Sequence, residues 1–176
     1  FCFCGASTPA GLVRNPALGE MIIGTRITLQ DFSDSEIRPY LDHLVRNNET
    51  AEHVLSRIHA WTGGHPYLTQ LACAEWNRHG RNLASVDEFF RKQTATVGNQ
   101  HQSDHLVALS RALLNVQLPD LPVEESRVRV LDALSQIARA TRISASRFPR
   151  ALIDSLLICG VIREEGSSVM IRNRIY

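Results

Sequence analysis

Lysine is almost absent from this chain of 176 residues: of its 19 basic residues, only Lys92 is a lysine. A P-loop needs a lysine followed by serine or threonine after a glycine-rich loop, because this ammonium group and the loop amides hold the nucleotide phosphates. Lys92 instead lies in a stretch with a helical pattern, so the chain contains no Walker A motif. It also has no apolar strand ending in paired acids to hold magnesium. We therefore expect no ATPase activity from this chain alone.

Long apolar runs and strong charge are also missing. No stretch approaches the roughly 20 apolar residues of a membrane span. The net charge is only +1, so whole-chain electrostatics require neither nucleic acid nor an anionic membrane. The cysteines lack zinc-type spacing and stand at Cys2, Cys4, Cys73 and Cys159. We expect reduced thiols in a cytoplasmic protein with no metal site.

Catalytic and metal-binding patterns are weak. No Ser-His-Asp or Cys-His arrangement can be recognised from spacing, so we predict no catalytic residue. His101 and His105 are four residues apart and could share one helix face as metal ligands. No glutamate follows His101 in the zincin pattern, and no third ligand is evident. We interpret the pair as the solvated start of a helix.

Most of the chain has helical periodicity. With 44% hydrophobic residues, it can bury a core in one or two small domains. Ser33 with Glu36 forms a capping-box pattern, and Ser85 with Glu88 forms a second. A polar stretch over 95–104 precedes another predicted helix over about 104–115. The helix predicted after the first capping box has this apolar face: Ile37, Tyr40, Leu41, Leu44 and Val45.

The sequence after Pro122 predicts a winged-helix-like module. The proline-rich stretch 118–122 is the clearest boundary in the chain. A helix with one apolar stripe should follow it, and Pro149 should open a second helix that Gly160 ends. Short apolar stretches at 161–162 and 169–171 then flank a turn at 165–167, which predicts a β-hairpin. The stripe of the first helix consists of Val130, Leu131, Leu134, Ile137 and Ala138.

The stretch 61–70 joins two helical patterns through a turn of unusual composition. Its two glycines, Gly63 and Gly64, can end the first helix in left-handed geometry, and Pro66 suits the first turn of the second. One interpretation is a structural corner between two helices. The other is a nucleotide-contacting turn, in which the proline ring meets a flat base and helix amides face an anion. His65 would be neutral there, because the positive end of a helix dipole disfavours imidazolium; alternatively, it merely packs the turn.

Gly64-His65-Pro66 resembles the Gly-x-Pro turn in the helical lid of STAND-type signalling NTPases, a branch of the AAA+ P-loop ATPases. Three more segments resemble a bacterial AAA-like domain of this kind, in the same order: residues 5–13, 27–36 and 172–176. Residues 20–23 depart from the Pro-Phe-Asn-like stretch that the family usually has before its next glycine. The resemblance spans almost the whole chain.

The resemblance implies a mainly α chain in three parts. Residues 1–30 would be the end of a truncated α/β P-loop core, with its last strand at 1–4; residues 31–118 would be the helical lid and 119–176 the winged-helix-like domain. Ser7 or Thr8, which could also simply cap a helix, would then lie near a terminal phosphate. ATP or ADP with magnesium would bind the parent protein, strongly only with the missing N-terminal P-loop half.

The function implied is a nucleotide-dependent signalling switch that converts ADP or ATP binding into domain rearrangement. Its partners would be effector or sensor domains of the same polypeptide, and self-association is open. The alternative is a winged-helix DNA-binding or protein-interaction adaptor that does not use nucleotide. DNA is the weaker candidate, because the second helix after Pro122 offers only Arg150 and Asp154 among its charges. This is too little to neutralise several phosphates.

Overall fold

The computed structural model describes residues 30–44, 48–79, 82–94 and 104–176. The predicted strand at 1–4, Ser7, Thr8 and His101 lie outside these residues. By spatial contacts, the described chain divides into two compact units. We call residues 30–108 with 171–176 the helical unit, and residues 109–170 the sheet unit. The units divide between residues 108 and 109, whereas the sequence analysis placed a domain boundary between residues 118 and 119. Residues 171–176 belong to the helical unit.

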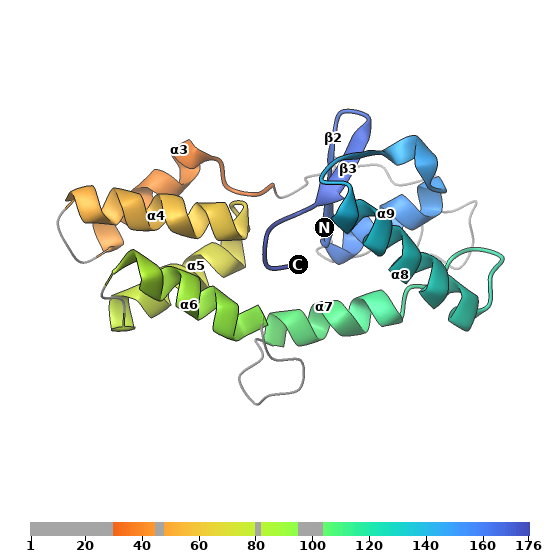
Figure 1. Ribbon diagram of the computed structural model, residues 1–176, viewed down its shortest axis with the longest axis horizontal. Helices are drawn as coiled ribbons and strands as arrows, with labels where there is room; N and C mark the ends of the chain where they lie inside the picture. The colour runs from red at the N-terminus through yellow and green to blue at the C-terminus, as the bar shows by residue number, and fades with distance from the viewer. Residues whose placement is uncertain (1–29, 45–47, 80–81, 95–103) are drawn as a thin grey trace, which may run out of the picture. The chain divides into compact units, whose positions relative to one another are not determined.

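Three helices form the body of the helical unit (Figure 1). They are α4 (Asn48–Thr62), α5 (Pro66–His79) and α6 (Leu83–Thr94), and each packs against the other two. Helix α7 (Asp104–Leu114) begins in this unit and continues into the sheet unit. The apolar faces of the two helical patterns on either side of the glycines form its core. The buried residues of this core include Val54, Ile58, Leu68, Ala72, Trp76 and Phe90.

The helix predicted after Ser33 is shorter than expected. Helix α3 (Asp34–Ile37) has a single turn and changes to a 3₁₀ helix, η1 (Arg38–His43). The Glu36 carboxylate accepts the backbone N–H of Ser33 at 2.9 Å, as the capping-box pattern predicted. Pro39 explains the change, since it has no N–H to continue the α-helical ladder. Ile37 and Leu44 are buried nevertheless.

The start of α6 corrects a second prediction. The helix begins at Leu83, two residues before the predicted cap at Ser85. Asn82 is the cap, because its side-chain Oδ1 accepts the backbone N–H of Ser85 at 3.1 Å. Asparagine is as good an N-cap as serine. The predicted serine therefore occupies the third helical position, and Glu88 pairs with Lys92 at 2.7 Å instead of capping the helix.

The sheet unit contains two helices and a small three-stranded sheet. Its elements are α8 (Val123–Arg139), β1 (Ile143–Ser144), the 3₁₀ helix η2 (Ala145–Arg147), α9 (Arg150–Cys159), β2 (Ile162–Glu165) and β3 (Ser168–Ile171). The strand order is β1-β3-β2, and Ile143 faces Val169 in the antiparallel pair β1–β3. The predicted fold class, a mainly helical chain with a small β-hairpin module, is confirmed. Strand β1 was not predicted.

The buried face of α8 differs from the predicted stripe. Val130 and Ile137 are buried as expected, but Leu131 is 53% exposed and Ala138 is also exposed. Ser126 and Ala133 are buried in their place, which rotates the stripe to positions spaced by four, three and four residues. Ser126 and Ala133 contribute little to a hydrophobicity pattern, so the sequence did not indicate that they are buried.

The other landmarks of the sheet unit follow prediction. Gly160 ends α9 in left-handed geometry with φ +76°, and its N–H bonds the Leu157 carbonyl at 3.0 Å. Gly166 has φ +62° in the two-residue turn of the β2–β3 hairpin. In the described residues, we find no helix with the length and apolar character needed to cross a membrane.

Candidate functional site

The turn between α4 and α5, residues 63–66, has the predicted backbone. Gly63 and Gly64 have φ values of +58° and +81°, in the left-handed region. The N–H of Gly63 bonds the His59 carbonyl at 2.8 Å and closes α4, and Pro66 is the first residue of α5. Both local predictions, a glycine end and a proline start, are confirmed.

A neighbouring backbone explains why Gly64 must be glycine. The N–H of Phe32 donates to the Gly64 carbonyl at 2.8 Å, and His59 Nε2 lies 3.1 Å from the Phe32 carbonyl oxygen. A Cβ atom on Gly64 would stand 2.1 Å from that same oxygen. The entry segment around Phe32 is therefore clamped against the turn, and no larger residue fits without moving it.

Two buried threonines tie the helices together beneath the turn. Thr62 and Thr69 are fully buried, and their hydroxyls hydrogen-bond each other at 3.0 Å. The Thr62 hydroxyl also accepts the N–H of Gly64 at 3.3 Å. This connection joins the last residue of α4 to the first turn of α5, so buried hydrogen bonds, which are stronger in the low dielectric of the interior, fix the corner.

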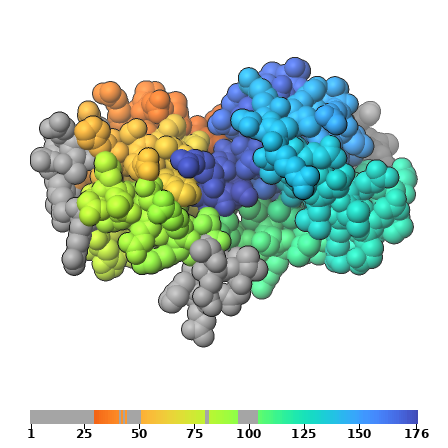
Figure 2. Space-filling view, in the orientation of Figure 1, coloured from red at the N-terminus to blue at the C-terminus, as the bar shows by residue number. Residues whose placement is uncertain are grey.

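The last six residues of the chain, Ile171–Tyr176, return to this turn, and we call them the C-terminal strap (Figure 2). The Arg172 guanidinium pairs with Asp31 through two prongs: Nη2 donates to Oδ1 at 2.6 Å, and Nε donates to Oδ2 at 2.9 Å. The N–H of Arg174 donates to the Trp61 carbonyl at 3.2 Å. Its guanidinium lies 4.8 Å from the centre of the Trp61 ring, a cation–π distance.

The strap has its own internal bracket. Asn173 Oδ1 accepts the N–H groups of Ile175 and Tyr176 at 3.0 and 3.2 Å. This arrangement bends the chain end so that Ile175 is buried, with 8% of its surface exposed. The strap is therefore a defined turn docked on the helical unit.

Four rings meet beside the turn. His65 lies 5.0 Å from His105 of α7 and 6.3 Å from Tyr176, both in edge-on geometry. His105 Nε2 also hydrogen-bonds the Tyr176 hydroxyl. Tyr67, the second residue of α5, lies 5.3 Å from His105 and is 45% exposed. We call His65, Tyr67, His105 and Tyr176 the ring cluster; the Tyr67 ring is exposed and the other three rings are half-buried.

Burial and charge favour the neutral form of the cluster's histidines. Burial, together with the positive charge of Arg172, lowers the pKa of His65 to about 4. Burial, again with Arg172, lowers the pKa of His105. Burial raises the pKa of Tyr176. The sequence predicted a neutral His65 from the helix dipole, whereas the structure points chiefly to burial.

Unsatisfied polar atoms mark the same place. Within the described residues, His65 Nδ1 and Asn173 Nδ2 are buried side-chain atoms without a hydrogen-bond partner. Buried polar atoms without a partner are uncommon in folded proteins, and each needs an explanation, such as a bound ligand, a water molecule or a functional role. A neutral imidazole offers one donor and one acceptor nitrogen, so His65 could exchange a hydrogen bond with a nucleotide base or ribose.

The structure therefore brings together three of the predicted site residues, Gly64, His65 and Pro66. It adds Asp31, His105, Arg172 and Tyr176, which sequence reasoning missed as site residues. The block at 172–176 gave a signal, because it belonged to the resemblance, but nothing linked it to the turn. We find no cluster of three metal-ligating side chains in the described part of the chain. His105 is half-buried in the ring cluster, which corrects its interpretation as part of a solvated helix start, and His101 lies outside the described residues.

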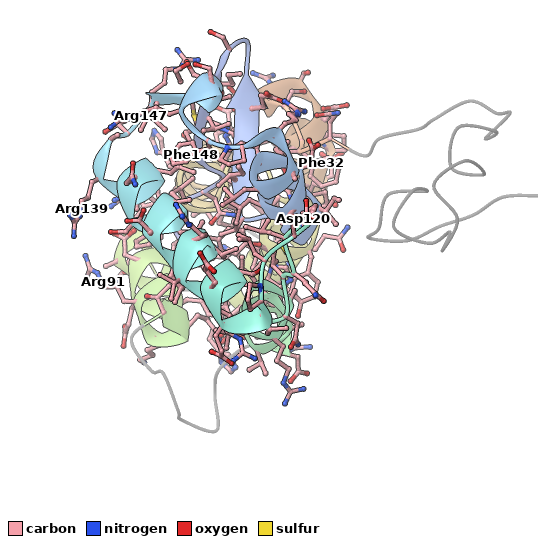
Figure 3. The ribbon with its side chains drawn as sticks, turned by 90° about the vertical axis from the view of Figure 1, so that its right-hand side faces the viewer. Phe32, Arg91, Asp120, Arg139, Arg147 and Phe148 are labelled. Carbon is pink, nitrogen blue, oxygen red and sulfur yellow. The ribbon has the colours of Figure 1, made fainter. Side chains whose placement is uncertain are left out.

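Most arginines on and near α9, the second helix after Pro122, are paired with acids. Arg150 of α9 bonds Asp154 at 2.9 Å and Glu164 at 3.0 Å. Arg142 and Arg163 both pair with Glu165, at 2.6 and 3.2 Å. Figure 3 shows Arg139 and Arg147 projecting outward, and both are exposed. The paired charges would have to leave their partners before they could meet phosphates.

Comparisons with known proteins give one partial match. No family model matches the chain, and no solved structure matches it. A 73-residue stretch is 37% identical to part of an uncharacterised WD repeat-containing protein of the Synechocystis strain PCC 6803. The match covers 42% of this chain and 6% of that protein. The chain thus spans a small fraction of the relative's length.

Proposed function

We propose that this chain is the helical lid and winged-helix-like part of a STAND-like ATPase, acting as a nucleotide-dependent signalling switch. Its P-loop half would precede it in the same polypeptide. The order of a helical bundle followed by a small sheet module supports this reading. So does the turn geometry, since the glycine end and proline start are those of the resembled Gly-x-Pro turn.

One observation carries the proposal: the strap that follows β3 is anchored at the turn by Arg172 and Asp31. A switch needs a physical link between the residues that meet the nucleotide and the domain that must move. Here the chain leaves the sheet unit at β3 and binds directly beside His65. Any rearrangement of the turn therefore bears on the segment that leads out of the sheet unit.

The residues present fit the base side of a nucleotide. Pro66 offers a rigid ring, Tyr67 an exposed aromatic ring, and His65 a neutral ring with an unsatisfied nitrogen. ATP or ADP with magnesium, held mainly by the P-loop half, would supply the state that the switch detects. Ser7 or Thr8 would approach the terminal phosphate in this scheme. This chain would contribute recognition, not the chemistry of hydrolysis.

The relative's size and name extend the proposal. WD repeats occur in that protein, and the matched stretch is a small part of it. We propose that this chain, too, is joined to effector or sensor domains that receive or pass on the signal. The alternative function is an adaptor that does not use nucleotide. Of its two forms, protein interaction is favoured over DNA binding, because the arginines of α9 and β2 are paired with acids.

The test uses two variants of the turn, Pro66→Ala and His65→Ala, and one control variant, Pro39→Ala, all in the full-length protein. Pro66→Ala should weaken ATP and ADP binding by more than it lowers the unfolding midpoint, since alanine is tolerated in a first helical turn. Pro39→Ala, in η1, is the matched control and should leave nucleotide affinity unchanged. His65→Ala should shift the ratio of ADP to ATP affinity. The proposal is wrong if both turn variants change only stability, or if the purified 176-residue chain hydrolyses ATP with magnesium.

A further inference from the structure

The strap lies on the surfaces of the turn that nucleotide would need. A methyl group added to Gly63 would stand 2.9 Å from the Arg172 carbonyl oxygen and 3.4 Å from Asn173 Cβ. The Tyr176 ring stands edge-on to His65, and its hydroxyl bonds His105. The strap therefore contacts Gly63 and the His65 ring, one of the three rings that the proposed function assigns to nucleotide.

A small set of polar and aromatic contacts holds the strap. They are the Arg172–Asp31 pair, the N–H of Arg174 on the Trp61 carbonyl with its guanidinium over the Trp61 ring, and the Tyr176 ring beside His65 and His105. Ile175 is its buried apolar anchor. Individual hydrogen bonds contribute little net stability, and segments held by few contacts open locally at lower free energy than the core. A six-residue segment held in this way can detach while the helices beneath it stay folded.

Asp31 is the central contact of this set. Its side chain and that of Arg172 are 19% and 21% exposed, so solvent screens the pair only partly. Two-pronged arginine–carboxylate pairs are stronger and more directional than single ones. Asp31 also adjoins Phe32, whose backbone is bonded to Gly64. The pair thus connects the strap to the same entry segment that clamps the turn.

We propose that the C-terminal strap is a latch on the turn: the Arg172–Asp31 pair holds it closed, and the closed strap and a bound nucleotide exclude each other. This inference rests on the proposed function and names the regulation of its site. Thermodynamic linkage makes the exclusion reciprocal, so nucleotide loosens the strap by the same factor by which the strap weakens nucleotide binding. Release of the strap would free the chain that follows β3.

The first arm of the test measures the latch without nucleotide, in the full-length protein. Asp31→Asn keeps the shape of the side chain but removes its charge. Hydrogen exchange at the Arg174 amide should become about tenfold faster, because local opening then costs less. Glu88→Gln, which breaks the exposed Glu88–Lys92 pair of α6, is the control and should leave this amide unchanged. Arg172→Lys, which keeps charge but loses the two-pronged geometry, should give an intermediate rate.

The second arm measures ATP and ADP affinity in the same variants. Asp31→Asn should tighten the binding of at least one nucleotide several-fold, and that nucleotide should accelerate Arg174 exchange in the unmodified protein. Unchanged exchange in both Asp31→Asn and Arg172→Lys would overturn the latch itself. Faster exchange with unchanged or weaker nucleotide binding would overturn the mutual exclusion, while a loss of affinity in Pro66→Ala would still uphold the proposed function. Unaltered ATP and ADP affinities in both Pro66→Ala and His65→Ala would refute the latch and the proposed function together.

Discussion

Substitution of Gly64 by alanine should destabilise the helical unit far more than its small size suggests. Gly64 has φ +81°, and left-handed backbone costs an L-residue roughly 1–2 kcal/mol. The new methyl group would also stand 2.1 Å from the Phe32 carbonyl oxygen, so the Phe32 segment must move away. That movement sacrifices the Phe32 N–H bond to the Gly64 carbonyl, worth about 1 kcal/mol net. The two costs together amount to about 2–3 kcal/mol.

Two other glycines provide a graded comparison. Gly166 has φ +62°, but an added Cβ meets nothing within 4 Å, so Gly166→Ala should cost only the backbone term of about 1–2 kcal/mol. Gly63→Ala should lie between the two, because its Cβ would press on the Arg172 carbonyl at 2.9 Å. Backbone geometry is similar at all three positions. Differences among them therefore isolate the contribution of steric contact.

Urea denaturation measures this series well. Both tryptophans of the chain, Trp61 and Trp76, lie in the helical unit, so their fluorescence reports its unfolding, and circular dichroism reports the loss of helix in both units. With a slope of roughly 1–3 kcal/mol per molar urea, a loss of about 2–3 kcal/mol shifts the midpoint by about 1 M or more. Equal destabilisation by Gly64→Ala and Gly166→Ala would refute the clamp of Phe32 on the turn.

Three further predictions concern charge. The pKa of His65, lowered by burial to about 4 from 6.5, means that the unfolded chain binds the extra proton first; stability should therefore fall as pH drops from 6.5 toward 4, and His65→Phe should flatten that part of a thermal-midpoint profile. The hydrogen bond from Arg57 holds the pKa of Asp87 at about 2, below its usual 3.8. The contribution of this ionised carboxylate to the free energy of unfolding should be complete above pH 3.8 and lost as pH falls through 2. Asp87→Asn should remove this pH-dependent part of an acid-unfolding curve. The sheet unit's arginines should give no duplex DNA complex tighter than about 10⁻⁵ M at physiological salt in a titration by fluorescence anisotropy, and a nanomolar complex with a defined site would contradict this.

Local signals in the sequence predicted much of the fold. The glycines at 63 and 64, Pro66 and Gly160 each have a backbone preference that few other residues share, and each lies where the pattern placed it. The predictions failed where two local preferences competed. Pro39 interrupted a helix that the apolar spacing favoured, and Asn82 capped α6 ahead of Ser85. Strand β1, with two residues, is too short to produce any periodicity.

The candidate site was predictable only in part, for a different reason. Its turn is continuous in sequence, so His65 and Pro66 could be identified from neighbours alone. Asp31 and Arg172 are 141 positions apart, and no periodicity connects them. His105 was interpreted as part of a solvated helix start, because spacing along one helix cannot reveal that the Tyr176 ring packs against it. Pairings of this kind depend on tertiary packing.

The buried pair of threonine hydroxyls has a mechanical consequence. Thr62 and Thr69 lock the end of α4 to the start of α5, and the Gly64 carbonyl holds the entry segment as well. An angle braced on its inner side behaves as a rigid elbow, so the two helices should travel as one lever. We therefore expect bending at the contacts between this helix pair and its neighbouring segments. The Arg172–Asp31 ion pair is one such contact, so a small displacement of the two helices should change its geometry directly.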